Sequence, residues 1–85
     1  MQIELFPNPF SSQTTILVSK EPYVEGDRDK EKFNYILYSI QGQAVEKGVG
    51  NFDQELNLGK ELPKGIYVLE LFVQKEKQTV KMVKN

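Results

Sequence analysis

The sequence predicts a small all-β protein, an immunoglobulin-like antiparallel β-sandwich of about seven strands. Its 85 residues suffice for one domain and are too few for two hydrophobic cores. Apolar residues alternate with polar ones or cluster in short runs, and helical spacing is not sustained anywhere. Gly, Pro, Asn and charged residues separate these runs at regular spacing, which is typical of a two-sheet sandwich. A small barrel is the alternative architecture.

Seven strands are expected from these patterns. In chain order they span Ile3 to Phe6, Gln13 to Ser19, Phe33 to Ile40, Ala44 to Lys47, Phe52 to Leu58, Ile66 to Val73 and Gln78 to Lys84. The third range has apolar residues on both faces, which predicts a central strand, and the sixth is the most hydrophobic run and predicts the core strand. Gly48 and Gly50 are expected to break the fourth strand, because glycine weakens a strand interior.

Three connections between these strands carry specific expectations. Pro7 and Pro9 fix φ and withhold two backbone donors, so the chain must turn or bulge there, with Phe10 plugging one end of the sandwich. Glu21 to Lys32 contains a dense run of charges, which predicts a long exposed loop. Gly42 is expected to take a positive φ in a hairpin turn.

Charge and hydropathy argue against two classes of partner. Eleven Lys and Arg against twelve Asp and Glu leave a formal charge of -1, which gives no electrostatic attraction to nucleic acid or to an anionic membrane. The sequence has no long apolar run and no basic start followed by an apolar leader. We therefore expect no membrane insertion, and any export signal lies elsewhere.

The residue content also argues against catalysis. The chain contains no His and no Cys, the residues most used as general bases and nucleophiles at neutral pH. We predict no enzymatic activity and no cofactor. Ser11 and Ser12 could act as nucleophiles only with a general base, and the sequence places none beside them. We interpret them as turn residues whose hydroxyls bond to nearby backbone groups.

A calcium site is disfavoured as well. Asp27, Asp29 and Glu31 alternate like the opening of a calcium loop. Lys32 stands where such a loop needs glycine, and Tyr38 stands where it needs a bidentate glutamate. A solvated loop is the favoured interpretation, and no metal is expected.

Four segments of the sequence, taken together and in order, resemble one family. We call them the opening segment (Leu5-Phe6-Pro7-Asn8-Pro9-Phe10), the middle segment (Ile40-Gln41-Gly42-Gln43-Ala44-Val45), the third segment (Leu62-Pro63-Lys64-Gly65-Ile66-Tyr67-Val68) and the terminal segment (Lys81-Met82-Val83-Lys84-Asn85). The family that they resemble is the C-terminal sorting domain of the type IX secretion system, also called the Por secretion system domain. The resemblance spans nearly the whole chain.

The resemblance implies a non-catalytic sorting signal. Residues 1–85 would form a single domain at the C-terminus of a larger exported protein, from which this chain is excised. In the family, an outer-membrane translocon recognises the domain, and in many cargoes a surface sortase removes it and joins the cargo to lipopolysaccharide. The implied partners are the translocon, a sortase and the covalently linked N-terminal cargo. The implied location is the periplasm in transit, then the cell surface or the medium.

By position, the resemblance marks a set of sorting-motif residues. They are Pro7, Asn8, Pro9, Phe10, Gly42, Gly65, Tyr67, Lys81, Met82, Val83 and Lys84. On physical grounds we expect the closing strand to be presented as a sheet edge to which a translocon component adds a strand. The alternative function is an adhesive or carbohydrate-binding module of a surface protein, with Tyr23 and Tyr38 as its stacking platform.

Overall fold

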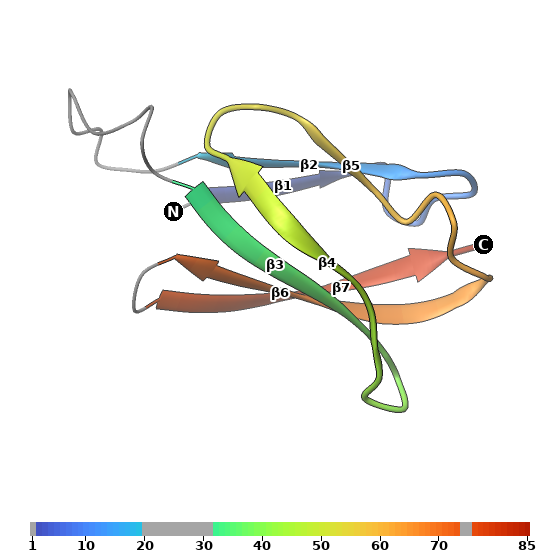
Figure 1. Cartoon of the computed structure of the whole chain (residues 1–85). Helices are drawn as coiled ribbons and strands as arrows, with labels where there is room; N and C mark the ends of the chain where they lie inside the picture. The colour runs from blue at the N-terminus through green and yellow to red at the C-terminus, as the bar shows by residue number, and fades with distance from the viewer. Residues whose placement is uncertain (1, 20–31, 74–75) are drawn as a thin grey trace, which may run out of the picture.

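The computed structural model describes residues 2–19, 32–73 and 76–85. Within these ranges every regular element is a strand, and seven strands form two antiparallel sheets (Figure 1). One sheet has three strands in the order β1-β2-β5, and the other has four in the order β4-β3-β6-β7. The predicted all-β sandwich is therefore confirmed.

The observed strands follow the expected order along the chain. They are β1 (Gln2–Phe6), β2 (Thr14–Ser19), β3 (Lys32–Ser39), β4 (Ala44–Asn51), β5 (Leu56–Leu58), β6 (Gly65–Val73) and β7 (Glu76–Lys84). The loop expected over Glu21 to Lys32 lies outside the described residues except for Lys32, which begins β3. β7 begins two residues earlier than the predicted Gln78.

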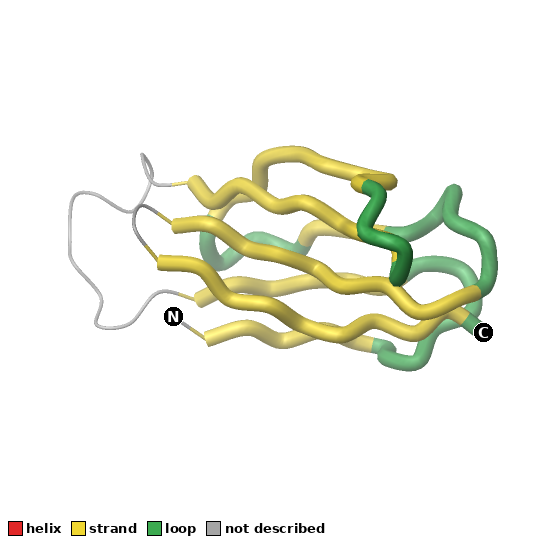
Figure 2. The backbone as a smooth tube through the Cα atoms, turned by 90° about the horizontal axis from the view of Figure 1, so that it is seen from below, coloured by secondary structure: helices red, strands yellow, loops and turns green. Residues whose placement is uncertain are grey.

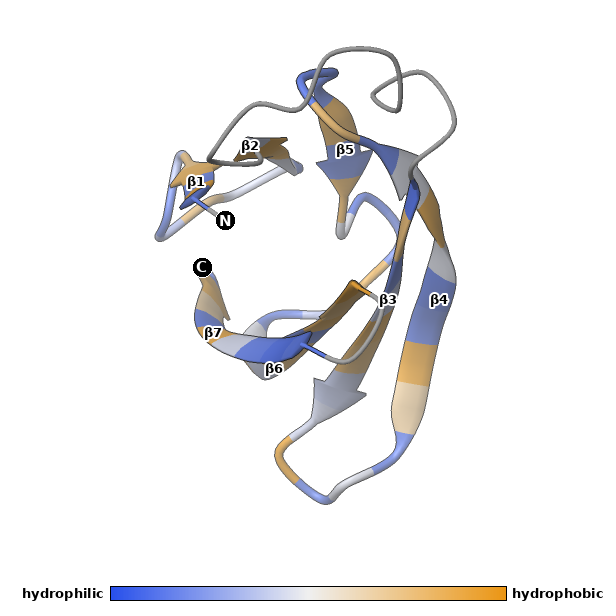
Figure 3. Cartoon of the chain, turned by 90° about the vertical axis from the view of Figure 1, so that its left-hand side faces the viewer, coloured by the Kyte–Doolittle hydropathy of each residue, from blue (hydrophilic) through white to orange (hydrophobic). Residues whose placement is uncertain are grey.

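The four-stranded sheet has β3 and β6 at its centre, as their apolar patterns predict. In a constant-type immunoglobulin domain the fourth strand joins the sheet of the first, second and fifth strands. Here β4 pairs with β3 instead. Figure 3 shows the four-stranded sheet curving so that β4 rises toward β5, where the Gly59 amide donates to Glu46 Oε1 at 3.3 Å.

The core lies between the two sheets and is built by strand alternation. β2 contributes Ile16 and Val18, and the facing sheet contributes Leu37, Leu69 and Met82, all of them fully buried. Fully burying one such side chain stabilises the fold by about 1.5–3 kcal/mol. Because the chain has no cysteine, this burial must hold the domain together without a disulfide.

The prediction that Gly48 and Gly50 break the fourth strand is wrong, because β4 continues through both to Asn51. The register places Gly48 opposite Tyr35 and Gly50 opposite Phe33. A Cβ at Gly48 would lie 2.9 Å from Tyr35 Oη, and a Cβ at Gly50 would collide with the Phe33 ring. The glycines therefore make room for two aromatic side chains of the neighbouring strand.

The strand expected over Phe52 to Leu58 is shorter than predicted. Only Leu56–Leu58 is a strand, and residues 52–54 form a turn. Asp53 takes a positive φ of 60° there, and its amide donates to the Val18 carbonyl at 2.8 Å. The buried Phe52 ring meets the Phe33 ring edge-on, with centroids 5.7 Å apart. Phe52 therefore packs in the core although it lies in a turn and not in a strand.

Candidate recognition site

The four segments singled out in the sequence lie toward one end of the sandwich. Figure 1 shows the connections after β1, β3 and β5 and the C-terminus toward the same end, while the N-terminus lies at the other. Figure 2 shows the connections after β1 and β5 meeting beside the C-terminus. The segments form two pairs: the opening segment contacts the terminal segment, and the middle segment lies beside the third.

The opening segment is hydrogen-bonded to the outer edge of β7. Phe10 N donates to Val83 O at 2.9 Å, and Asn85 N donates to Phe10 O at 2.7 Å. The Asn8 side chain completes the contact, because Val83 N donates to its Oδ1 at 3.0 Å and its Nδ2 donates to Lys81 O at 2.9 Å. We call this set of four hydrogen bonds the clamp.

Phe10 anchors the clamp in the core. Its side chain is only 1% exposed, which confirms that it plugs one end of the sandwich. Gly59 makes room for it, because a Cβ at Gly59 would lie 2.9 Å from the Phe10 ring, and the positive φ of 81° there also favours glycine. The opening segment is further fixed by Thr14, whose hydroxyl donates to Pro7 O at 2.7 Å.

Lys84 is a buried cation of the same cluster. Its Nζ donates to Gly59 O at 2.7 Å and to Lys60 O at 3.2 Å, and it lies 5.8 Å from the centroid of the Phe10 ring. Backbone carbonyls and a ring face are polar partners that a buried ammonium accepts in place of water. Lys84 therefore fastens the terminal segment to the connection after β5.

The terminal segment thus divides between the two faces of β7. Met82 and Lys84 are buried, whereas Lys81 is exposed and Val83 is half-buried. The expectation that the end of the closing strand is an open edge is wrong, because the clamp occupies the backbone groups of Val83 and the carbonyl of Lys81. A strand added to β7 would have to displace the opening segment or pair with Glu76 to Val80.

The middle and third segments face each other across an open hollow. Gly42 has a φ of 89° in the β3–β4 turn, as predicted, and its amide donates to Ser39 O at 2.9 Å. The buried Tyr67 donates its hydroxyl to Pro63 O at 2.6 Å, which fixes the chain on either side of Gly65. The hollow between the two segments is about 340 Å³ in volume. Its lining includes Ile40, Val45, Pro63, Lys64 and Ile66.

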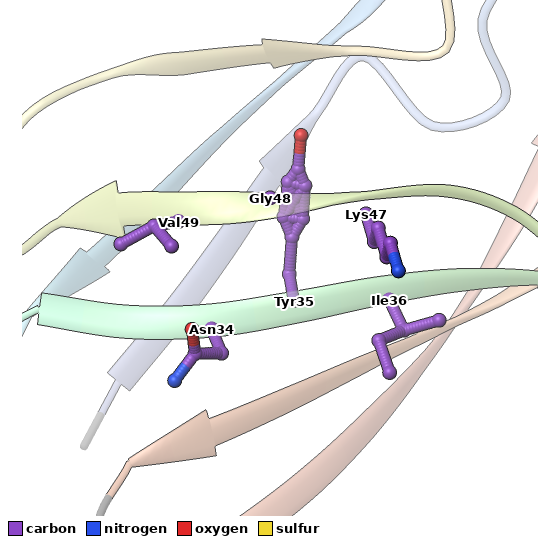
Figure 4. Close-up of a pocket in the computed structure, with 6 residues that line it drawn as sticks. All are labelled: Asn34, Tyr35, Ile36, Lys47, Gly48 and Val49. Carbon is purple, nitrogen blue, oxygen red and sulfur yellow. The ribbon is translucent and has the colours of Figure 1, made fainter.

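A second hollow, of about 420 Å³, lies along β3 and β4. Figure 4 shows Tyr35 extending across Gly48 on one side of the sheet, while Asn34 and Ile36 point to the other. Tyr35 Oη donates to Glu46 Oε2 at 3.3 Å. Burial, followed by the Glu46 charge and this hydrogen bond, raises the pKa of Tyr35 above its ordinary value, so the phenol stays protonated.

The other candidate residues do not form a site in the described part of the chain. Asp27, Asp29, Glu31 and Tyr23 lie outside it. Ser11 and Ser12 are exposed in the β1–β2 connection. Tyr38 is half-buried on the outer face of β3, and burial, followed by the charge of Glu70, raises its pKa.

Neither a group of three or more His, Cys, Asp or Glu side chains able to hold a metal ion nor a helix that could span a membrane is found among residues 2–19, 32–73 and 76–85.

Sequence reasoning missed Glu46, which accepts hydrogen bonds from Tyr35 and Gly59 on the inner side of β4. Lys84 is among the predicted sorting-motif residues, but its burial was not predicted. Alternation with the apolar Met82 was the one available signal for Lys84, because residues two apart in a strand share a face.

The fold and this end of the molecule define a class of protein: a small β-sandwich whose sequence motifs gather around its C-terminal strand. Comparison with known families is more specific. The family model for the secretion system C-terminal sorting domain matches residues 4–85, so the chain belongs to this family. A search of curated proteins gives no match. Members of the family carry a C-terminal sorting signal for type IX secretion, which takes a cargo protein across the outer membrane.

Proposed function

We propose that this domain is the C-terminal address of a larger exported protein and that it acts by recognition, without catalysis. The observation that carries the proposal is the family match over residues 4–85, together with the meeting of the four motif segments at one end of the sandwich. The N-terminus, where a preceding cargo would join, lies at the opposite end (Figure 1). A translocon component could therefore approach the motif end without meeting the cargo first.

The clamp stabilises the folded end of the domain that carries the motif segments. An unanchored C-terminal strand would fray, because chain ends are poorly ordered unless they are tied down. The four hydrogen bonds of the clamp and the buried Lys84 tie the terminal segment to two other parts of the chain. We infer that the translocon recognises the folded end of the domain, after passage of the cargo through the periplasm.

Removal of the domain by a surface sortase, and attachment of the cargo to the cell surface, are further parts of this proposal. Cleavage would fall before β1, because the whole of β1 is paired with β2 as part of the sandwich. Cargo released in this way would lack the sandwich entirely. The mass of a secreted reporter distinguishes cleaved from intact cargo.

The test is export of a fluorescent reporter that carries a periplasmic export signal and residues 2–85 at its C-terminus. It is expressed in a bacterium with the type IX system and in the same strain lacking the translocon. We expect fluorescence at the surface or in the medium only in the competent strain, and only with the domain attached. Periplasmic retention in a competent strain that still exports a control cargo would contradict the proposal.

A further inference from the structure

The outer face of the four-stranded sheet carries an apolar surface that the sandwich core does not use. Ile66 and Val68 of β6 are 42% and 36% exposed, and Val49 of β4 is 57% exposed. Ile36 and Tyr38 of β3 lie between these strands on the same face and are half-buried. We call these five residues the outer patch. Contiguous exposed apolar surface on a small soluble domain indicates an interaction site.

Two lysines border the outer patch on opposite sides. Lys47 of β4 is the cross-strand partner of Ile36, and Lys81 of β7 is the cross-strand partner of Val68, so each shares the face of its partner. Among the described residues no carboxylate lies within ion-pair distance of either lysine. Lys64 adds a third positive charge at the hollow that adjoins Ile66.

Among the described residues, the carboxylate on this part of the outer face is that of Glu70, and it already forms an ion pair. Glu70 of β6 contacts the Lys77 ammonium at 3.5 Å, and its charge helps to raise the pKa of Tyr38. Glu46 of β4 points to the inner side, where Tyr35 and Gly59 bind it. The charges left on the described part of this face are therefore positive, in a chain whose formal net charge is -1.

The outer face of the three-stranded sheet differs in its charges. Glu4, Thr15 and Asn57 lie on it beside the half-buried Leu17 and the exposed Phe6, and the Thr15 hydroxyl donates to Asn57 Oδ1 at 2.9 Å. Both outer faces therefore carry apolar side chains. The strands β1, β2 and β5 contain no lysine, so the lysine border belongs to the four-stranded sheet.

We propose that the outer patch binds a protein of the secretion machinery through a surface in which apolar side chains are flanked by Asp or Glu. This inference rests on the proposed sorting function. Charge complementarity selects the partner, because Lys47 and Lys81 lie at the patch border without acidic partners in the described chain. A nucleic acid is a poor match, since two lysines neutralise few phosphates.

The first test changes the patch without touching the core. Val68→Glu places a negative charge within the outer patch, and Lys81→Glu reverses a border charge. Thr15→Glu on the other sheet and Glu55→Lys, which reverses an exposed charge outside the patch, are matched controls. In the reporter fusion we expect about a tenfold or greater loss of export for the two patch variants, with the controls close to the unaltered domain; a tenfold change corresponds to about 1.4 kcal/mol of binding free energy.

Folding is checked separately by the thermal unfolding of each variant of residues 2–85. Patch variants that unfold like their controls and are still exported at the unaltered rate would overturn the inference. If the unaltered domain itself is not exported, the proposed function fails instead, so the two failures are distinguishable.

The second test identifies the occupant directly. A photoreactive amino acid replaces Val68 in one fusion and Thr15 in another, and cells are irradiated during export. We expect the fusion altered at Val68 to form an adduct with an outer-membrane component of the secretion system, joined within an apolar stretch that carries Asp or Glu. Equal labelling at both positions would contradict this. Binding of residues 2–85 to phosphatidylglycerol vesicles, lost in Lys81→Glu and without a protein adduct, would assign the patch to lipid and overturn the inference.

Discussion

The two pairs of motif segments differ in what they leave accessible. In the opening and terminal pair, Phe10 and Met82 are buried and the clamp occupies the outer edge of β7. In the middle and third pair, Ile40 is 65% exposed and shares an open hollow with Ile66. The comparison shows that motifs of one family serve two purposes here. The closed pair holds the C-terminal strand, and the open pair adjoins the surface available to a partner.

The largest expected effect is on the closed pair. Phe10→Ala should lower the free energy of unfolding by about 3–5 kcal/mol, because it leaves a cavity beneath the clamp and removes the ring facing Lys84. A domain of this size has little stability to spare. Urea denaturation measures the loss, and Phe6→Ala, at a residue that is 41% exposed, is the control. Equal losses of unfolding free energy in Phe10→Ala and Phe6→Ala would show that the closed pair does not depend on the burial of Phe10.

The second largest loss of stability is expected when the two hydrogen bonds that the Asn8 side chain adds to the clamp are removed. Asn8→Ala leaves the Val83 amide and the Lys81 carbonyl without their side-chain partners, which should cost about 1–2 kcal/mol because both groups keep some access to water. Hydrogen exchange at the Val83 amide should become faster in the same variant. Ser11→Ala, at an exposed neighbouring residue, provides the baseline. Unchanged protection of Val83 would show that Asn8 does not hold the strand.

The third segment has one buried polar contact that can be removed cleanly. Tyr67→Phe deletes the hydroxyl that donates to Pro63 O, and it should lower the free energy of unfolding by about 0.5–1.5 kcal/mol. Thermal unfolding of the variant measures this. A loss as large as that of Phe10→Ala would mean that the open pair carries as much of the fold as the closed pair.

A pH effect follows from Tyr35. Its pKa is raised by burial and then by Glu46, so the fold favours the protonated phenol. The corresponding stability is fully present below the unfolded pKa of about 10 and is lost as the pH rises through the higher folded value. Unfolding free energies between neutral pH and strongly alkaline pH should therefore fall more steeply in the unaltered domain than in Tyr35→Phe. Parallel curves would rule out this contribution.

The smallest effect is expected at the open pair. Ile40→Ser should change the free energy of unfolding by no more than about 0.5 kcal/mol, because the side chain is exposed at a turn and packs against little. The same denaturation experiment checks it. A large loss here would show that the hollow is part of the core.

The strands could be predicted from the sequence because alternation reports which side of a sheet is buried. Leu37, Leu69 and Met82 were assigned to strands in this way, and all three are fully buried. The extent of β4 could not be predicted, because it depends on contacts with the neighbouring strand. There the Phe33 ring covers Gly50 and the Tyr35 ring covers Gly48. A glycine that makes room for a ring and a glycine that ends a strand look the same in one sequence.

The motif residues could be named in advance, but their arrangement could not. The clamp joins Asn8 to Lys81 and Val83, residues more than 70 positions apart in the chain. Nothing local in the sequence indicates that an asparagine between two prolines will bind the edge of the last strand. The burial of Lys84 depends likewise on the carbonyls of Gly59 and Lys60, which only the folded chain brings together.

The most direct test of the division between a closed pair and an accessible face is the export of two folded variants of the reporter fusion. Asn8→Ala weakens the clamp, and Val68→Glu alters the outer patch while leaving the clamp in place. At a temperature where thermal unfolding shows both to be folded, we predict export of Asn8→Ala close to that of the unaltered domain and retention of Val68→Glu in the periplasm. Normal export of Val68→Glu together with retention of folded Asn8→Ala would contradict the account.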